Sequence, residues 1–82
     1  MPIPEPDLKL LRDIFNSRRH EADMTFDQLA EVSGLSRQTL LNISSGRYNG
    51  DLRTWLKLSS AFEVTLDELF APLTEEEQRA IG

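Results

Sequence analysis

The stretch from Thr25 to Gly46, TFDQLAEVSGLSRQTLLNISSG, constrains the fold of this chain more than any other. It contains two short amphipathic segments, and each has a helix-capping residue before it and a glycine after it. A tight turn at Ser33–Leu35 separates the two segments. The spacing predicts two short helices that meet at this turn. The polar side chains Arg37, Gln38 and Thr39 lie at the start of the second helix.

Eighty-two residues are enough for one small domain. Such a domain buries only about 60–65% of the surface of its unfolded chain, so dimerisation would add stability. There is no cysteine, which excludes disulfides and thiolate chemistry, and a single histidine excludes a metal site built from several histidines. The chain also lacks a glycine-rich phosphate loop. We therefore expect no metal, no cofactor and no enzymatic activity.

The sequence contains no sign of membrane insertion or export. No apolar run approaches the roughly 20 residues that a membrane-spanning helix needs. The first residues, MPIPEPD, have neither the basic nor the apolar region of a signal peptide. We therefore expect a cytoplasmic protein with no membrane partner.

The net charge of −5 is unusual for a protein that binds nucleic acid, but the charge is unevenly distributed. Residues 1–32 carry four basic and seven acidic side chains, and residues 61–82 carry one basic and six acidic ones. Residues 33–60 carry four basic side chains against one aspartate, a balance of +3. The positive block coincides with the second helix of the central stretch and the loop after it, so the field is polarised.

An extended arm and one helix are predicted before the central stretch. Residues 1–6 contain three prolines and are expected to be extended. Asp7 is the expected cap of a helix that runs to about His20. Apolar residues at helical spacing give this helix one inward stripe, formed by Leu8, Leu11, Ile14 and Phe15.

Capping signals set the bounds of the two central helices. Thr25 and Gln28 form an expected capping box at the start of the first helix, and Gly34 ends it. Ser36 caps the second helix, which Gly46 ends. The side chains expected to point inward are Leu29, Ala30, Leu35, Leu40 and Ile43.

Two more capped helices and an acidic end follow. Asp51 and Thr65 are the expected caps of a fourth helix and a short fifth one. The inward stripe of the fourth helix is expected to contain Leu52, Trp55, Leu56, Ser59 and Phe62, with Leu58 beside it. We assign residues 7–71 to one domain and residues 72–82 to an acidic tail or short helix capped by Thr74. No segment alternates with period two, so we expect an all-α fold without strands.

Residues 24–70 resemble the Cro/repressor-type helix-turn-helix family, also called the xenobiotic-response-element type, whose domain is lambda-repressor-like. The family pattern contains Leu-Ala-x-x-x-Gly, a hydrophobic residue, Ser and a polar triplet, then a glycine-basic loop and a Leu-Asp-Glu-Leu close. In this chain it reads Leu29-Ala30-Glu31-Val32-Ser33-Gly34, Leu35-Ser36, Arg37-Gln38-Thr39, Leu40, Gly46-Arg47 and Leu66-Asp67-Glu68-Leu69. The resemblance covers more than half of the chain in one register without gaps.

The resemblance implies a compact five-helix domain that places its third helix, residues 36–45, in the major groove of a double-stranded DNA operator. It implies a homodimer on two-fold-related half-sites, and a Cro-like repressor of phage or bacterial type. Carried over by position, Arg37, Gln38 and Asn42 would read bases, since arginine pairs with guanine and glutamine with adenine. The DNA backbone would be contacted by Thr25, Gln28, Ser36, Thr39, Arg47, Tyr48 and Asn49.

Three positions depart from the family pattern. The first residue of the second helix, often a glutamine that contacts phosphate, is Phe26. Either that contact is missing here, or Thr25 or Gln28 takes it over. The glutamate near the end of the third helix is Ser44, and the glycine after the fourth helix is Glu63. A left-handed conformation at a non-glycine residue costs about 1 kcal/mol.

Other readings of the same residues remain open. The acidic ends could be the working surface of a protein-interaction module, such as an antitoxin that holds a basic toxin or a regulator that docks on polymerase. Tyr48 could pack on the fourth helix instead of contacting DNA, and Arg18 and Arg19 could simply end the first helix. The apolar residues left for a dimer contact are Leu73, Ile81 and Phe70, together with the proline-rich arm.

Overall fold

The computed structural model describes residues 7–73, and this part of the chain contains five complete helices, three further helical residues at 71–73 and no strand. The helices are α1 (Leu10–Glu21), α2 (Phe26–Ser33), α3 (Arg37–Ser45), α4 (Leu52–Ala61) and α5 (Leu66–Leu69). The prediction of an all-α fold with five helices is therefore confirmed. The predicted arm at residues 1–6 and the acidic helix after Thr74 lie outside the described residues, and the division at residue 71 stays a prediction.

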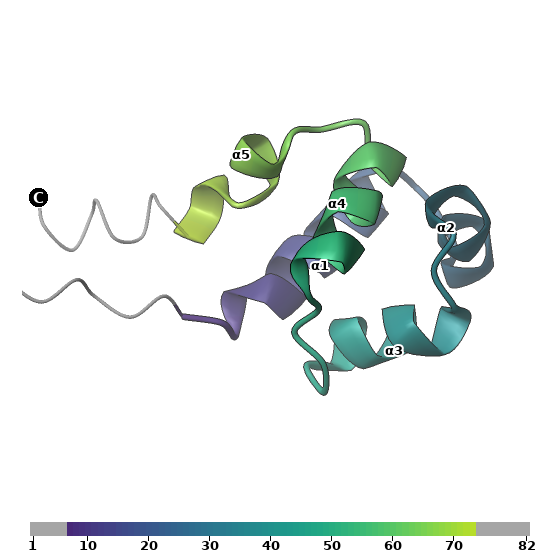
Figure 1. The fold of residues 1–82 in the computed structure, drawn as a ribbon, viewed down its shortest axis with the longest axis horizontal. Helices are drawn as coiled ribbons and strands as arrows, with labels where there is room; N and C mark the ends of the chain where they lie inside the picture. Colours follow the sequence, from purple (N-terminus) through teal and green to yellow (C-terminus); the bar gives the residue numbers. More distant parts are fainter. Residues whose placement is uncertain (1–6, 74–82) are drawn as a thin grey trace, which may run out of the picture.

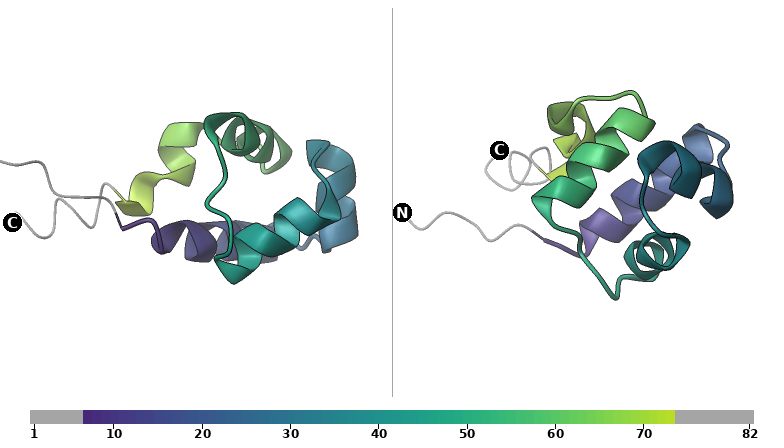
Figure 2. Two further views of the ribbon diagram at one scale, coloured as in Figure 1. Left: turned by 60° about the horizontal axis from the view of Figure 1, so that its bottom comes forward. Right: turned by 45° about the vertical axis from the view of Figure 1, so that its right-hand side comes forward.

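The helices form one cluster with α1 and α4 at its centre (Figure 1). α1 packs against α3, α2 packs against both α3 and α4, and α5 packs against α4. The views in Figure 2 show that α2 stands at a steep angle to α3. α3 therefore runs along one side of the molecule, with one face toward the core and the other toward solvent (Figures 1 and 2).

The core is built from side chains that all five helices contribute. Leu29 of α2, Leu40 of α3 and Leu58 of α4 have no exposed surface, and they join the three helices at the centre. Burial of one such side chain contributes about 1.5–3 kcal/mol. The buried apolar residues are Leu11, Ile14, Phe15, Leu29, Leu40, Ile43, Trp55, Leu58 and Leu69.

The predicted caps of α2 and α3 are confirmed. Thr25 Oγ1 accepts a hydrogen bond from the Gln28 N–H at 3.1 Å, and Gln28 Oε1 accepts one from the Thr25 N–H at 2.9 Å. Ser36 Oγ accepts a hydrogen bond from the Thr39 N–H at 3.1 Å. Gly34 ends α2 with φ of 75°, which glycine adopts without strain. These local contacts satisfy backbone groups that a helix end leaves free and fix the start of each helix.

The start of α1 differs from the prediction. Asp7 does cap a turn, since its Oδ1 accepts a hydrogen bond from the Lys9 N–H at 3.0 Å, but the helix begins only at Leu10. The turn directs Leu8 outward, and its side chain is 48% exposed. The inward stripe of α1 is therefore shorter than predicted, and it starts at Leu11.

The predicted stripe on α4 is wrong at two positions. Leu52 is 66% exposed and Leu56 is 49% exposed, whereas the buried face carries Thr54, Trp55, Leu58 and Ser59. Trp55 explains the rotation, because its indole N–H donates to the Asn49 carbonyl at 2.7 Å and its ring meets Phe70 edge-on at 5.3 Å. With Trp55 held between the loop and α5, Leu52 and Leu56 lie on the outer side of α4.

Two non-glycine residues close helices in the left-handed conformation. Glu63, which follows α4, has φ of 58°, and Asp23, which follows α1, has φ of 54°. Glu63 therefore adopts the left-handed conformation at the position where the family often has a glycine. Each such residue costs on the order of 1 kcal/mol relative to glycine, and the surrounding helix packing offsets this cost.

Candidate nucleic-acid interface

The outward face of α3 carries the three residues predicted to read bases. Arg37 and Gln38 are exposed and Asn42 is half-buried, while Leu40 and Ile43 on the opposite face are fully buried. The apolar face fixes the rotation of α3 about its axis. The structure therefore brings the predicted base-reading residues together on one solvent-facing surface, as the sequence led us to expect.

Gln38 and Asn42 form a pair one helical turn apart. Gln38 Nε2 donates to Asn42 Oδ1 at 3.1 Å. This contact leaves Gln38 with one N–H and its amide oxygen, and it leaves Asn42 with both of its N–H groups. An N–H beside a carbonyl oxygen is the combination that pairs with adenine N7 and N6 in the major groove. The pair thus restrains the Gln38 amide while its recognition groups stay available.

Arg37 forms an ion pair with a residue that the sequence did not single out. Its Nε lies 3.0 Å from Oδ1 of Asp27, in the first turn of α2. Both side chains face solvent, with exposed fractions of 59% for Arg37 and 81% for Asp27. The two residues lie in different helices, and only the steep crossing of α2 and α3 brings them together. Sequence spacing alone gave no signal for this contact.

Four of the predicted backbone-contacting residues lie in the first turns of α2 and α3. Thr25 and Gln28 occupy one turn, Ser36 and Thr39 occupy the other, and the ion pair between the two helices joins these turns. Their side chains already serve as caps, and Ser36 Oγ also lies 2.8 Å from Thr39 Oγ1. The Gln28 side chain only accepts a hydrogen bond within its cap, so its side-chain amide N–H groups can still donate to a phosphate.

Phe26 fills the position where the family often has a phosphate-contacting glutamine. Its ring stacks on Phe15 with a centroid distance of 6.4 Å, and the Arg19 guanidinium carbon lies 4.4 Å from its centroid. Arg19 also donates from Nη1 to the Met24 carbonyl at 2.9 Å. The residue that departs from the pattern therefore packs, half-buried, against the edge of the core. Arg19 therefore does more than end α1, since its side chain contacts Met24 and Phe26 at the start of α2.

The loop after α3 presents the other predicted backbone contacts. The Arg47 and Tyr48 N–H groups both donate to the Asn42 carbonyl, at 2.9 and 3.2 Å, so the loop turns back on the end of α3. The Asn49 carbonyl is held by the Trp55 indole. The side chains of Arg47, Tyr48 and Asn49 are all exposed. Tyr48 is 40% exposed, so it is not buried against α4 and is free to meet a ligand.

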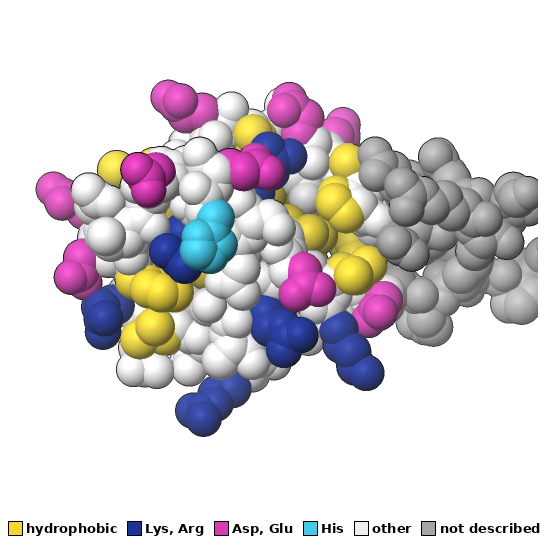
Figure 3. Space-filling model, turned by 180° about the vertical axis from the view of Figure 1, so that it is seen from behind, with side chains coloured by type: hydrophobic (Ala, Val, Ile, Leu, Met, Phe, Trp, Pro, Cys, Tyr) yellow, Lys and Arg dark blue, Asp and Glu magenta, His cyan; other side chains and the backbone are white. Residues whose placement is uncertain are grey.

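Two basic residues, Arg12 of α1 and Lys9 just before it, lie next to this loop, which the sequence did not indicate. A Cβ atom placed on Gly46 would lie 3.5 Å from Arg12 Cδ, so the arginine runs past the end of α3. Arg12 and Lys9 line a groove between α1 and the loop, whose other residues are Leu8, Ile43, Ser45, Gly46 and Asn49. In Figure 3 the Lys and Arg side chains gather in the lower part of the molecule, and most acidic ones lie above. On this face, most basic side chains therefore lie apart from most acidic ones.

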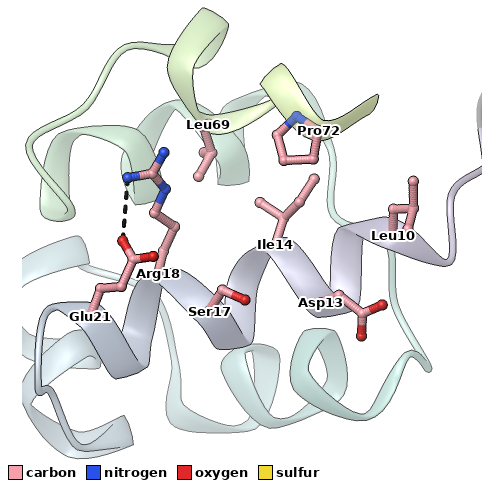
Figure 4. A pocket seen from close by; sticks show the side chains of 8 residues that line it. All are labelled: Leu10, Asp13, Ile14, Ser17, Arg18, Glu21, Leu69 and Pro72. Carbon is pink, nitrogen blue, oxygen red and sulfur yellow. Dashed lines mark ion pairs between the residues drawn. The ribbon is translucent and has the colours of Figure 1, made fainter. Parts of the chain in front are cut away.

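A second groove lies between α1 and α5, away from α3 (Figure 4). Apolar side chains from both elements face it, and Arg18 and Glu21 form an ion pair of 3.6 Å at one end. Its lining residues are Leu10, Asp13, Ile14, Ser17, Arg18, Glu21, Leu69 and Pro72.

No helix within residues 7–73 is long and apolar enough to cross a membrane.

Comparison with known proteins identifies the family. A family model described as helix-turn-helix matches residues 15–69, which contain α2, the turn and α3. The chain therefore belongs to the helix-turn-helix family, a family of DNA-binding transcriptional regulators, and to its Cro/repressor type.

Two archaeal relatives are similar over most of this region. An uncharacterized HTH-type transcriptional regulator of Archaeoglobus fulgidus is 33% identical over 52 residues, which are 63% of this chain and 74% of the relative. Another, from Methanocaldococcus jannaschii, is 33% identical over 48 residues, or 58% and 73% of the two chains. A solved structure, hypothetical transcription factor NHTF from Neisseria, has a TM-score of 0.69 at 23% identity, over 100% of this chain and 97% of that one. This likeness supports the fold.

Proposed function

We propose that this protein is a sequence-specific transcriptional regulator of the Cro-like repressor type, which inserts α3 into the major groove of an operator in the cytoplasm of a prokaryotic cell. The observation that carries the proposal is the outward face of α3, where Arg37 and the Gln38–Asn42 pair present free donors and acceptors together. Repression would follow from occupation of the operator and exclusion of polymerase.

The contacts divide into those that read bases and those that position the protein. Arg37, Gln38 and Asn42 would face base edges. The residues on both sides of α3 would contact phosphates without reading sequence, and they are Thr25, Gln28, Ser36, Thr39, Arg47, Tyr48 and Asn49. Lys9 adds a positive charge beside the Arg47 loop, and so does Arg12, whose Nε also lies 3.7 Å from Asp13 Oδ1. This local charge offsets the acidic balance of the whole chain, because phosphate attraction depends on the charge that faces the DNA.

Selection of bound sequences from random DNA, followed by titrations at two salt concentrations, tests the proposal. A repressor should enrich one motif and lose affinity steeply as salt rises. Arg37→Ala should relax the base preference at one position of the motif. Arg47→Gln should weaken binding to all sequences alike and lower the slope of log affinity against log salt by about 1. Lys57→Gln on α4 is the matched control and should change neither. Equal affinity for the selected and the scrambled DNA would refute sequence-specific recognition.

We further propose that the protein is a homodimer, at least on DNA, with its two α3 helices in successive major grooves about 34–36 Å apart. Phe70, one of the residues left for a dimer contact, is half-buried against Trp55 and contributes to the core. The groove between α1 and α5 in Figure 4 offers a surface for a second copy, since Leu10, Ile14 and Pro72 line it.

Ser17→Glu tests this surface, because Ser17 is exposed and lines the groove without entering the core. Sedimentation at micromolar concentration should show a dimer for the wild type with operator DNA and a shift toward monomer for the variant. Ser60→Glu, on the exposed side of α4, is the control. A dimer that survives Ser17→Glu would place the two-fold contact elsewhere.

Two carboxylates at the border of the same groove, one of them paired with Arg18, favour a second candidate function, docking of a basic protein segment. Asp13 and Glu21 border the groove on α1, and neither belongs to the α3 surface. Co-purification with a basic partner that Asp13→Lys abolishes, with no shift of any DNA, would support this interaction module over the repressor.

A further inference from the structure

The ion pair between α2 and α3 engages only one edge of the Arg37 side chain. Asp27 Oδ1 lies 3.0 Å from Nε, the nitrogen nearest the aliphatic stem. The guanidinium is planar and carries five N–H donors in a fixed arrangement, so holding Nε also sets the plane and direction of the two terminal nitrogens. These are the nitrogens that can donate together to O6 and N7 of guanine.

Both partners are exposed, so the pair adds little to the stability of the fold. The ion pair matters instead because it sets the direction in which the Arg37 guanidinium points. A free arginine at the first position of a helix samples many rotamers, and ordering it on binding opposes association. An arginine already held by a neighbouring carboxylate avoids part of this loss, provided that its fork points toward the base.

The position of Asp27 also carries a penalty for DNA binding. The first turn of α2 lies beside the first turn of α3, and a carboxylate there repels any phosphate that passes the edge of the interface. Asp27 should therefore lower the affinity for DNA in general while raising the preference for one base. These opposite effects distinguish it from a residue that only stabilises the helix.

We propose that Asp27 is a positioning residue that holds Arg37 for guanine at one position of each half-site. The inference rests on the proposed function, and it names the base that this part of the site selects. A purely structural role is the alternative, since an acidic residue in the first turn of α2 favours the helix dipole. That role would change stability and leave the base preference untouched.

The test compares Asp27→Asn with Glu31→Gln, which removes the same charge from an exposed position on the same helix. The probes are the selected operator, the same duplex with adenine in place of the guanine, and one with 7-deazaguanine there, which lacks the N7 acceptor. Asp27→Asn should reduce the preference for guanine by about three- to tenfold, a part of the discrimination that a bidentate pair supplies. It should also strengthen binding to non-specific DNA. Glu31→Gln should leave the preference unchanged.

A double-mutant cycle isolates the coupling. In an Arg37→Ala background, Asp27→Asn should no longer change the base preference, because the residue that it positions is gone. If Arg37→Ala relaxes the guanine position but Asp27→Asn does not, the positioning role is refuted and the proposed function stands. If no duplex is preferred by the wild type, the proposed function itself fails, and this inference fails with it.

A measurement on the free protein gives a readout that needs no DNA. The Arg37 Nε–H should exchange slowly with solvent in the wild type and faster in Asp27→Asn, since the negatively charged carboxylate lies 3.0 Å from that nitrogen. Glu31→Gln should not change the exchange rate. Equal exchange in the wild type and Asp27→Asn would show that the pair does not hold the arginine, and would overturn the proposal.

Discussion

Asn16 of α1 and Ser44 of α3 exchange two hydrogen bonds. The Ser44 hydroxyl donates to Asn16 Oδ1 at 2.7 Å, and Asn16 Nδ2 donates to the Ser44 carbonyl at 3.1 Å. Both residues are half-buried, and Ser44 stands where the family often has a glutamate. A neutral pair therefore ties the last turn of α3 to α1 here, and it helps to fix the direction in which the recognition helix leaves the core.

Asn16→Ala should remove both hydrogen bonds and leave the Ser44 groups without this partner. We expect a loss of about 1–2 kcal/mol in the free energy of unfolding, as for other partly buried hydrogen bonds. DNA affinity should fall without a change of base preference, because α3 loses orientation and keeps its base-reading residues. Urea unfolding and binding titrations measure the two effects. Ser60→Ala, on the exposed side of α4, is the control, and equal stability of both variants would contradict the role of the pair.

Gly50 should not tolerate a side chain. It has φ of 79°, and an added Cβ would come within 2.6 Å of Trp55 Nε1, the atom that holds the Asn49 carbonyl. Gly50→Ala should therefore cost more than about 2 kcal/mol, from backbone strain and from displacement of the indole. Gly34→Ala is the matched control, since φ is 75° there with nothing within 4 Å of the added atom. It should cost only about 1 kcal/mol.

Fluorescence of Trp55, the single tryptophan, reports on both variants during urea unfolding. Equal losses for Gly50→Ala and Gly34→Ala would show that only backbone conformation matters at residue 50, and that the close approach of the indole contributes nothing.

The helix starts could be predicted from the sequence because each cap is a local event. Thr25 with Gln28, Ser36 with Thr39 and the other capping residues each bond to a group three positions away. Such contacts depend on residue type and spacing, both of which are visible in the sequence. The first helix was predicted less well, because nothing in the sequence showed that Asp7 would cap a separate turn before it.

The site could be predicted only in part, for a related reason. The solvent-facing position of Arg37 and Gln38 followed from the buried positions of Leu40 and Ile43 on the same helix. The contacts of Arg37 with Asp27, of Arg12 with Gly46 and of Arg19 with Phe26 each join two separate segments. They depend on how the helices cross, and an amphipathic pattern does not specify this.

The rotation of α4 leads to a test that compares two leucines of the same helix. Leu58 has no exposed surface, whereas Leu56, predicted to point inward, is 49% exposed. Leu58→Ala should destabilise the fold by about 2–5 kcal/mol, because it leaves a cavity in the core. Leu56→Ala should change stability by no more than about 0.5 kcal/mol. Urea unfolding measures both variants. A large loss of unfolding free energy for Leu56→Ala would show that Leu56 packs inward, as the sequence predicted.

The cap of α4 should make part of the stability depend on pH. The backbone N–H of Thr54 donates to Asp51 Oδ1 at 2.8 Å, and this bond, followed by that to the Thr54 side chain, holds the pKa of Asp51 below its usual value. The folded state thus binds a proton on Asp51 less readily than the unfolded chain does. The stabilisation should be fully present above the usual aspartate pKa of about 4, and should be lost as the pH falls through the lower pKa of the folded state.

Asp51→Ser keeps a capping oxygen without the charge, so the stability difference between wild type and variant should shrink in that acidic range. Urea unfolding of both proteins between neutral and acidic pH measures this difference, and one that stays constant with pH would show that the ionised carboxylate adds nothing to the cap.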